Sequence, residues 1–412
     1  MKDSLKKKCD YSKDFIRKLP KTDLHVHLDG SLRVSTLIDL AKKHSVKLPS
    51  FTEAGLRKTV FKKRYGDLLE YLKGFDYTLA VMQTPEALER VAYEFAMDCF
   101  EDGVRYVEPR FAPQLHVNDL MAVEDVLISV NKGLARAKEE INTSKAIASG
   151  SEPYFEYGII CCAMRMFNEN FPGVFRKLLS VHKYMDREEL YGLAALDLVE
   201  SMIYCRDELG LPIVGFDLAG AESGYPAEHY KSSFELAHKN FFRKTVHAGE
   251  AYGPESIFQA IADCHADRIG HGTHIFDASM VKSGSKAEKE RYVNDLWQYV
   301  ADSRMTIEVC LTSNLQTKPE MKSVRSHPVS KMLEKRLSFT FCTDNMLVSD
   351  TTATDEILLA VNNFKINSNK LKDIIIYGFK RSFFPGDYLE KRRYIRSVID
   401  YYDRVEKEFF VS

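Results

Sequence analysis

Residues 19–33 read LPKTDLHVHLDGSLR, and this stretch decides how the rest of the chain is interpreted. Its part at 22–28 alternates polar and apolar side chains, which is typical of a β-strand with two different faces. Because side chains two residues apart point to the same face of a strand, we expect His25 and His27 to lie together there. Such a pair can share one metal ion, although an HxH pattern by itself is weak evidence and more often marks two solvent-facing or hydrogen-bonding histidines.

Seven further short runs of apolar and β-branched residues follow, with amphipathic, helix-like segments between them. This alternation is typical of parallel strands joined by crossover helices, and eight such strands close a barrel. We therefore predict a single (β/α)₈ TIM barrel of the α/β class that spans residues 1–412. Its strands are expected at 22–28, 104–110, 155–162, 213–218, 244–248, 267–270, 306–311 and 339–344.

The 412 residues exceed what a minimal barrel requires, which is roughly 250 residues. We expect the surplus in helical insertions at 29–103, after the first strand, and at 273–305, before the seventh. A helical C-terminal extension is expected after Thr351. Apolar residues recur at near-helical spacing within about 50–80, which predicts a helical lid over a pocket.

Composition and charge restrict the class of partner. The formal net charge of −1 supplies no positive field for a polynucleotide or an anionic membrane. We find neither a signal-peptide pattern nor a run of about 18 apolar residues, so we expect a cytoplasmic protein that contacts no nucleic acid and no membrane. The eight cysteines, Cys9 among them, include no CxxC pair, which indicates free thiols in a reducing compartment. The oligomeric state leaves no signal in one sequence.

Polar side chains stand where several of the predicted strands end. His247 closes the fifth strand, His271 follows the sixth, and Asp344 closes the eighth. Because the C-terminal ends of barrel strands converge on one rim, we expect these groups to meet the histidine pair of the first strand there. Glu250 lies three residues after His247 and is expected close to the same point.

Three imidazoles and one carboxylate suit a zinc ion that keeps one position open for water. We therefore predict one zinc ion per chain, whose bound water loses a proton near pH 7. His271 and Asp344 would steer that water, and Glu250, with its pKa raised by burial, would act as a general acid. The predicted ligands are His25, His27, His247 and Asp344.

The chain resembles the metal-dependent adenosine deaminase family along most of its length. The resemblance rests on a set of segments whose order and placement at strand ends also match. These are LPKTDLHVHLDGSLR at 19–33, DGVRYVEPRFAPQLH at 102–116, GFDLAGAE at 215–222, TVHAGEAYGPESI at 245–257, DRIGHGTH at 267–274, EVCLTSNLQT at 308–317 and FCTDNMLVSDTT at 341–352.

The resemblance implies hydrolytic deamination of adenosine and 2′-deoxyadenosine to inosine and deoxyinosine, with release of ammonia and a role in purine salvage. Zinc-bound hydroxide would attack purine C6 while Glu250 protonates N1 and His271 orients the water. It also implies contacts with a purine nucleoside substrate. These are expected from His27, from Asp29 to the ribose hydroxyls, from the Gly220 N–H to N3 and from Asn345 to N7.

Two positions differ from common family patterns. Asn345 stands where vertebrate members carry a second aspartate, but an amide can donate to N7 and bacterial-type members look similar. Ala221 stands where an acidic residue is common, and we have no functional account of it.

Two alternatives to adenosine deamination stay open on the sequence. The substrate could be another 6-aminopurine such as adenine or a modified adenosine, although related adenine deaminases tend to carry glutamate in place of Asp29. The second alternative is a non-catalytic nucleoside-binding protein. Such a protein would not need the general acid Glu250, so the presence of this residue counts against it. Seven other histidines are expected to bind no metal: His44, His182, His229, His238, His265, His274 and His327.

Overall fold

The computed structural model describes residues 11–410 apart from residue 172, so Cys9 and the ends of the predicted 1–412 domain lie outside the described residues. Every cysteine in the described part is a free, buried thiol. Among those same residues, no helix combines the length and apolar character required to cross a membrane.

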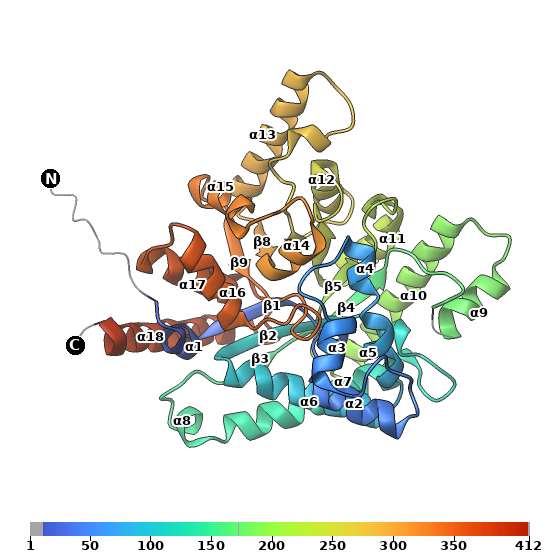
Figure 1. Ribbon diagram of the computed structural model, residues 1–412, viewed down its shortest axis with the longest axis horizontal. Helices are drawn as coiled ribbons and strands as arrows, with labels where there is room; N and C mark the ends of the chain where they lie inside the picture. Colours follow the sequence, from blue (N-terminus) through green and yellow to red (C-terminus); the bar gives the residue numbers. More distant parts are fainter. Residues whose placement is uncertain (1–10, 172, 411–412) are drawn as a thin grey trace.

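Parallel strands form the centre of the molecule and helices surround them (Figure 1). Eight of the strands follow one another in the order β1-β2-β4-β5-β6-β7-β8-β9, which confirms the predicted barrel. A short ninth strand, β3, pairs only with β2. The strands are β1 Lys21–His27, β2 Val104–Phe111, β3 Glu156–Tyr157, β4 Ile159–Met164, β5 Ile213–Ala219, β6 Arg243–Ala248, β7 Arg268–His271, β8 Thr306–Val309 and β9 Ser338–Phe341.

A bridge between Val26 and Asp344 joins the first strand to the last and closes the barrel. The His27 N–H donates to the Asp344 carbonyl at 2.7 Å, and the Asp344 N–H donates to the His25 carbonyl at 2.8 Å. Asp344 was predicted to end the eighth strand at 339–344, but β9 stops at Phe341. Asp344 instead occupies a left-handed backbone conformation with φ of 62°, which ends the regular ladder and turns its side chain toward the barrel axis.

Two other predicted strands differ from the observed ones. The run at 155–162 is divided into β3 and β4 at Gly158, where an added Cβ would lie 2.6 Å from the Val214 side chain. The close approach of neighbouring chain at this point therefore accounts for the glycine and the break. The run at 306–311 ends early because a helix begins at Leu311.

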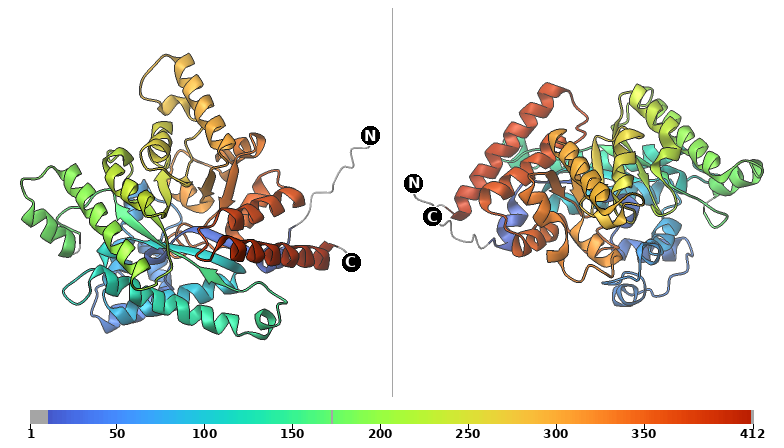
Figure 2. Two further views of the ribbon diagram at one scale, coloured as in Figure 1. Left: turned by 180° about the vertical axis from the view of Figure 1, so that it is seen from behind. Right: turned by 90° about the horizontal axis from the view of Figure 1, so that it is seen from above.

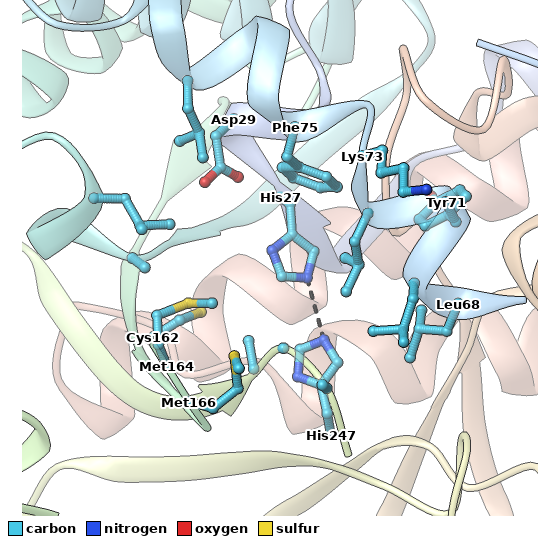
Figure 3. A pocket seen from close by; sticks show the side chains of 18 of the residues that line it. His27, Asp29, Leu68, Tyr71, Lys73, Phe75, Cys162, Met164, Met166 and His247 are labelled. Carbon is cyan, nitrogen blue, oxygen red and sulfur yellow. Dashed lines mark hydrogen bonds between the residues drawn. The ribbon is translucent and has the colours of Figure 1, made fainter. Parts of the chain in front are cut away.

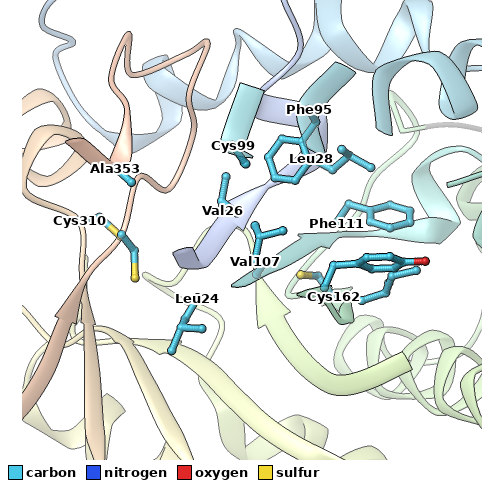
Figure 4. Packing of buried hydrophobic residues seen from close by; sticks show 14 of the residues in the cluster. Leu24, Val26, Leu28, Phe95, Cys99, Val107, Phe111, Cys162, Cys310 and Ala353 are labelled. Atoms are coloured by element: carbon cyan, nitrogen blue, oxygen red, sulfur yellow. The ribbon is translucent and has the colours of Figure 1, made fainter. Parts of the chain in front are cut away.

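Helices precede and follow the strands and pack on the outside of the barrel. In Figure 4, Val26 of β1 and Leu28, which directly follows this strand, lie beside Phe95 and Cys99 of α6, as expected for the outward face of the strand. The helices up to β5 are α1 Lys13–Lys18, α2 Val34–Lys43, α3 Glu53–Thr59, α4 Leu68–Leu72, α5 Phe75–Val81, α6 Pro85–Glu101, α7 Val123–Asn142, α8 Lys145–Ala148, α9 Gly173–Val181 and α10 Arg187–Asp207, with 3₁₀ turns η1 Leu28–Gly30 and η2 Pro113–Leu115.

The second half of the chain continues the same alternation and then ends in the predicted helical extension. The long α18 lies next to α1, which brings the two ends of the described chain together (Figure 1). The helices are α11 Lys231–Lys239, α12 Pro254–Ala262, α13 Lys286–Asp302, α14 Leu311–Thr317, α15 Val329–Glu334, α16 Ala353–Asn363, α17 Ser368–Arg381 and α18 Tyr388–Phe410, with 3₁₀ turns η3 Ala227–Tyr230, η4 Ala278–Met280 and η5 Val324–Ser326.

The surplus residues occupy the predicted places and one more. The insertion at 29–103 contains α2 to α6, and Figure 2 shows its α3–α5 part as a blue lobe on the body of the barrel. The stretch at 273–305 contains η4 and α13. The segment between β4 and α10, which includes α9, was not predicted as an addition, because its polar, glycine-containing sequence lacks a clear helical period before residue 173.

Gly133 permits the close contact between α6 and α7. An added Cβ at this buried helical position would lie 2.2 Å from the Glu89 carbonyl oxygen and 2.9 Å from the Ala92 Cβ. We expect G133A to lower the free energy of unfolding by about 1–3 kcal/mol, the usual cost of overpacking, despite the better helix propensity of alanine. Chemical denaturation measures this.

The matched control is G173A, because nothing lies within 4 Å of a Cβ added to Gly173, which is also helical. Its stability should equal or slightly exceed that of the parent. Equal stability of G133A and the parent would show that the two helices can separate without cost.

Candidate active site

A cavity of about 510 Å³ opens at the C-terminal ends of the strands, the place where the fold puts its active sites. Figure 3 shows His27 and His247 facing each other in it, with Met164 and Met166 on one side. Side chains from α4 and α5 form the other wall, so the segment predicted as a lid contributes to the cavity. These are Leu68, Leu69, Tyr71, Leu72, Phe75, Asp76 and Leu79.

The structure brings the predicted metal-binding residues together. One ligand atom each from His25, His247, His271 and Asp344 lie within 4.8 Å of one another. His27 belongs to the same group, because its Nε2 lies 3.1 Å from His247 Nε2 and 3.6 Å from Asp344 Oδ1. Five candidate side chains therefore surround one point, and geometry alone does not separate four ligands from a fifth neighbour.

This donor set fits a divalent cation. His25 Nε2 is buried and has no hydrogen-bond partner among residues 11–410, although it points at the Asp344 carboxylate 3.6 Å away. Burial lowers the pKa of His27 well below its ordinary value, so its imidazole keeps a lone pair near neutral pH. Imidazole nitrogens and a carboxylate that converge on one point are the donors that zinc prefers.

Carboxylates orient two of the imidazoles from inside the barrel. Glu308 Oε2 lies 2.8 Å from His25 Nδ1, and Asp217 Oδ2 lies 3.1 Å from His247 Nδ1. Because each carboxylate accepts the Nδ1 proton, each ring presents its Nε2 lone pair to the cavity. Both acids are completely buried.

Two buried arginines link these acids into one ion network. Arg110 donates to Asp217 and Glu308, at 2.9 Å in each case. Arg268 donates to Glu308 at 2.6 Å and also to Glu108. With Asp344 the group contains four carboxylates against two guanidiniums, so two negative charges remain for a dication to balance.

Glu250 lies on the cavity wall, 95% buried, with its Oε2 3.7 Å from His271 Nε2. Burial raises the pKa of the Glu250 carboxyl, and the neighbouring Asp344 carboxylate raises it further. A carboxyl in this state retains a proton near neutral pH. It is therefore able to donate to a bound molecule, as predicted for a general acid.

Glu222 shapes the loop that carries Glu250. Its carboxylate accepts the backbone N–H groups of Gly249, Glu250, Ala251 and Tyr252, with the first two at 2.7 and 2.9 Å, and also the Ser256 hydroxyl. One buried side chain thus satisfies four successive turn amides that would otherwise lack partners.

The residues expected to contact substrate also line the cavity. Asp29 is buried with its Oδ1 unpaired among the described residues, and burial raises its pKa to about 7. Gly220 adopts a φ of 98°, which only glycine tolerates easily. Asn345 donates through Nδ2 to the Tyr71 hydroxyl at 2.7 Å, so one of its amide protons is already engaged.

Sequence reasoning assigned no role to Asp217, Glu222, Glu308 or Arg110. A signal was present in the strands themselves, because charged residues at inward positions of otherwise apolar barrel strands require buried partners. The pairing of those charges was not readable, since each partner lies on a different strand.

Comparison with known proteins gives a consistent result. The family model described as adenosine deaminase matches residues 20–402. The chain is 37% identical over 374 residues to an adenosine deaminase of Mycobacterium avium (strain 104), covering 90% of this chain and 92% of that protein. An adenosine deaminase of Mycobacterium marinum is 36% identical, covering 94% and 96%.

Solved structures share the fold at low sequence identity. An adenine deaminase from Arthrobacter aurescens has a TM-score of 0.73 and 20% identity, covering 93% of this chain and 99% of that one. An amidohydrolase from Burkholderia ambifaria with bound zinc has a TM-score of 0.75 and 19% identity, covering 97% and 95%.

We expect E222Q to lower the free energy of unfolding by about 2 kcal/mol or more. A neutral amide offers a single acceptor oxygen, which leaves turn N–H groups buried without a partner at about 1–3 kcal/mol each. Urea denaturation with fluorescence detection measures the change. E228Q is the control, since Glu228 is exposed on the neighbouring turn η3; equal midpoints for both variants would remove the structural role of Glu222.

Proposed function

The chain belongs to the adenosine deaminase family, and from this premise we propose which residues perform the reaction and which metal assists it. It is a hydrolytic deaminase that converts adenosine to inosine and ammonia. The observation that carries the proposal is the convergence of His25, His27, His247 and Asp344 beside the buried Glu250, whose pKa burial raises. We extend the substrate to 2′-deoxyadenosine, since the chemistry takes place at the base.

Water must add to purine C6 while N1 receives a proton. We assign the N1 proton to Glu250, whose burial and proximity to Asp344 keep its carboxyl protonated. Asp344, whose pKa the surrounding imidazoles lower despite its burial, stays a carboxylate and accepts a hydrogen bond from the attacking water. His271 lies against both acids and orients that water.

One zinc ion per chain is the metal that we propose, held by His25, His27, His247 and Asp344. When bound, it supplies a lowered pKa for a coordinated water. His25 and His247 are pre-oriented for this role by Glu308 and Asp217.

The remaining contacts position the nucleoside. Asp29, with an unpaired oxygen toward the cavity, suits the ribose hydroxyls, and His27 and the Gly220 N–H suit the base. Asn345 keeps a second amide proton for N7 beyond its bond to Tyr71. The apolar wall from α4 and α5 would close over the base as a lid and exclude water.

We also propose a cytoplasmic location and a role in purine salvage. The buried free thiols of the described residues suit a reducing compartment. Conversion of adenosine to inosine is a step that purine recycling requires.

We expect E250Q to lower kcat for adenosine by about 10²–10⁴ without loss of metal, because glutamine cannot deliver a proton to N1. The loss of adenosine absorbance on conversion to inosine follows the reaction. E320Q is the control, since Glu320 is exposed and does not line the cavity. Normal turnover by E250Q would exclude Glu250 as the acid.

We expect D344N to lower metal affinity by more than about tenfold. Loss of a residue that only hydrogen-bonds to a metal ligand already lowers affinity by about tenfold or more, and Asp344 is proposed as a ligand itself. Metal analysis after dialysis of the purified protein against a chelator gives the content per chain. The matched control is D350N, because Asp350 also has a positive φ, 54° against 62° for Asp344, and is exposed. Full metal retention by D344N would contradict the ligand set.

A further inference from the structure

A chain of buried hydrogen bonds leads away from the cavity behind His271. Asn314 Nδ2 lies 3.1 Å from His271 Nδ1, and Asn314 Oδ1 lies 3.2 Å from His327 Nε2. The Val329 backbone N–H donates to His327 Nδ1 at 3.3 Å. All three side chains are at least 98% buried, so water does not compete for these positions.

The backbone end of this chain has a fixed polarity. An amide N–H can only donate, so His327 Nδ1 must carry a lone pair and the ring cannot be doubly protonated. Its single proton therefore resides on Nε2. Burial also lowers the pKa of His327 to about 3, which agrees with a neutral ring.

The donor and acceptor roles at His327 fix the orientation of the Asn314 amide. Because His327 Nε2–H donates, the amide of Asn314 must turn its oxygen toward it. The NH₂ group then faces His271. The opposite amide orientation would place two donors against each other at 3.2 Å between buried side chains.

We propose that Asn314 and His327 act as positioning residues that hold His271 in the Nε2–H tautomer. Asn314 Nδ2 donates to His271 Nδ1, so the only ring proton sits on Nε2, which faces Glu250 and Asp344. His271 thus presents a hydrogen-bond donor to the cavity.

This tautomer separates the ligands from their neighbour among the five converging side chains. A nitrogen that carries a proton has no lone pair for a metal ion, so His271 is excluded as a ligand and His27 takes the fourth place. It also means that His271 orients the attacking water by donating to its oxygen and does not remove its proton. That part rests on the proposed function, whereas the tautomer itself does not.

Asn314, His327 and Val329 all belong to one connection, between β8 and β9. Asn314 lies in α14, His327 caps the end of η5, and Val329 is the first residue of α15. The loop between them therefore acts on the cavity through His271, a residue of β7.

The test reads the tautomer directly. The zinc-loaded full chain, labelled with ¹⁵N-histidine, gives long-range ¹H–¹⁵N correlations in which protonated and unprotonated ring nitrogens are well separated. The His271 signals are assigned by their loss in H271Q. We expect a protonated Nε2 and an unprotonated Nδ1; the reverse pattern overturns the proposal whatever the activity.

N314D reverses the hydrogen bond between residue 314 and His271 Nδ1, because a carboxylate can only accept. We expect the His271 proton to move to Nδ1 and kcat for adenosine to fall by about 10²–10³, the usual loss for one catalytic donor, with KM changed less than about threefold. H327Q is the conservative variant, since its amide can still donate to Asn314. It should keep the Nε2–H signal and most of kcat.

The outcomes distinguish the two claims. An Nε2–H signal in the parent together with full kcat in N314D would contradict the role in positioning but leave the deaminase assignment intact. A parent that shows the expected tautomer but no turnover of adenosine would contradict the proposed function alone. If N314D fails to fold, the parent spectrum and H327Q still decide.

Discussion

The ion pairs of Arg110 and Arg268 inside the barrel are the interaction on which the site depends. They hold Asp217 and Glu308 at the positions from which these acids orient His247 and His25. A barrel of this kind is usually filled by layers of branched apolar side chains. Here charged groups replace part of that filling, and the same layer both packs the barrel and aims the imidazoles.

Such a network stabilises only as a complete set. Removing one partner from a buried ion pair leaves an uncompensated charge, at a cost of about 3–5 kcal/mol. The network with Asp344 has an excess of negative charge, and that excess is next to the converging imidazoles. The same excess of negative charge therefore causes repulsion between the carboxylates in the metal-free protein and attracts a dication. The ion that completes the site also balances its charge.

Much of the fold and the centre of the site could be predicted from sequence, because strand-end residues carry local signals. The HxH of β1 and His247 at the end of β6 follow directly from strand periodicity. Asp344 was placed correctly at the rim but in the wrong backbone state, since the closing bridge to Val26 depends on the opposite end of the chain.

Other features depend on partners that no local pattern names. Glu222 stabilises a turn of the next βα unit, and His327 was expected only to bind no metal. The significance of both comes from what they bond across the fold. The segment around α9 was missed for a different reason, since a short helix after a polar loop has little periodicity to detect.

The backbone bridge between Val26 and Asp344 also affects when the barrel can close during folding. Its two residues lie far apart in the sequence, so everything up to Asp344 must be synthesised before the barrel can close. Until then β1 carries an open edge that can pair with other chains. Closure places the Asp344 carboxylate among the imidazoles of β1, β6 and β7, so the contact that closes the barrel is also the contact that completes the site.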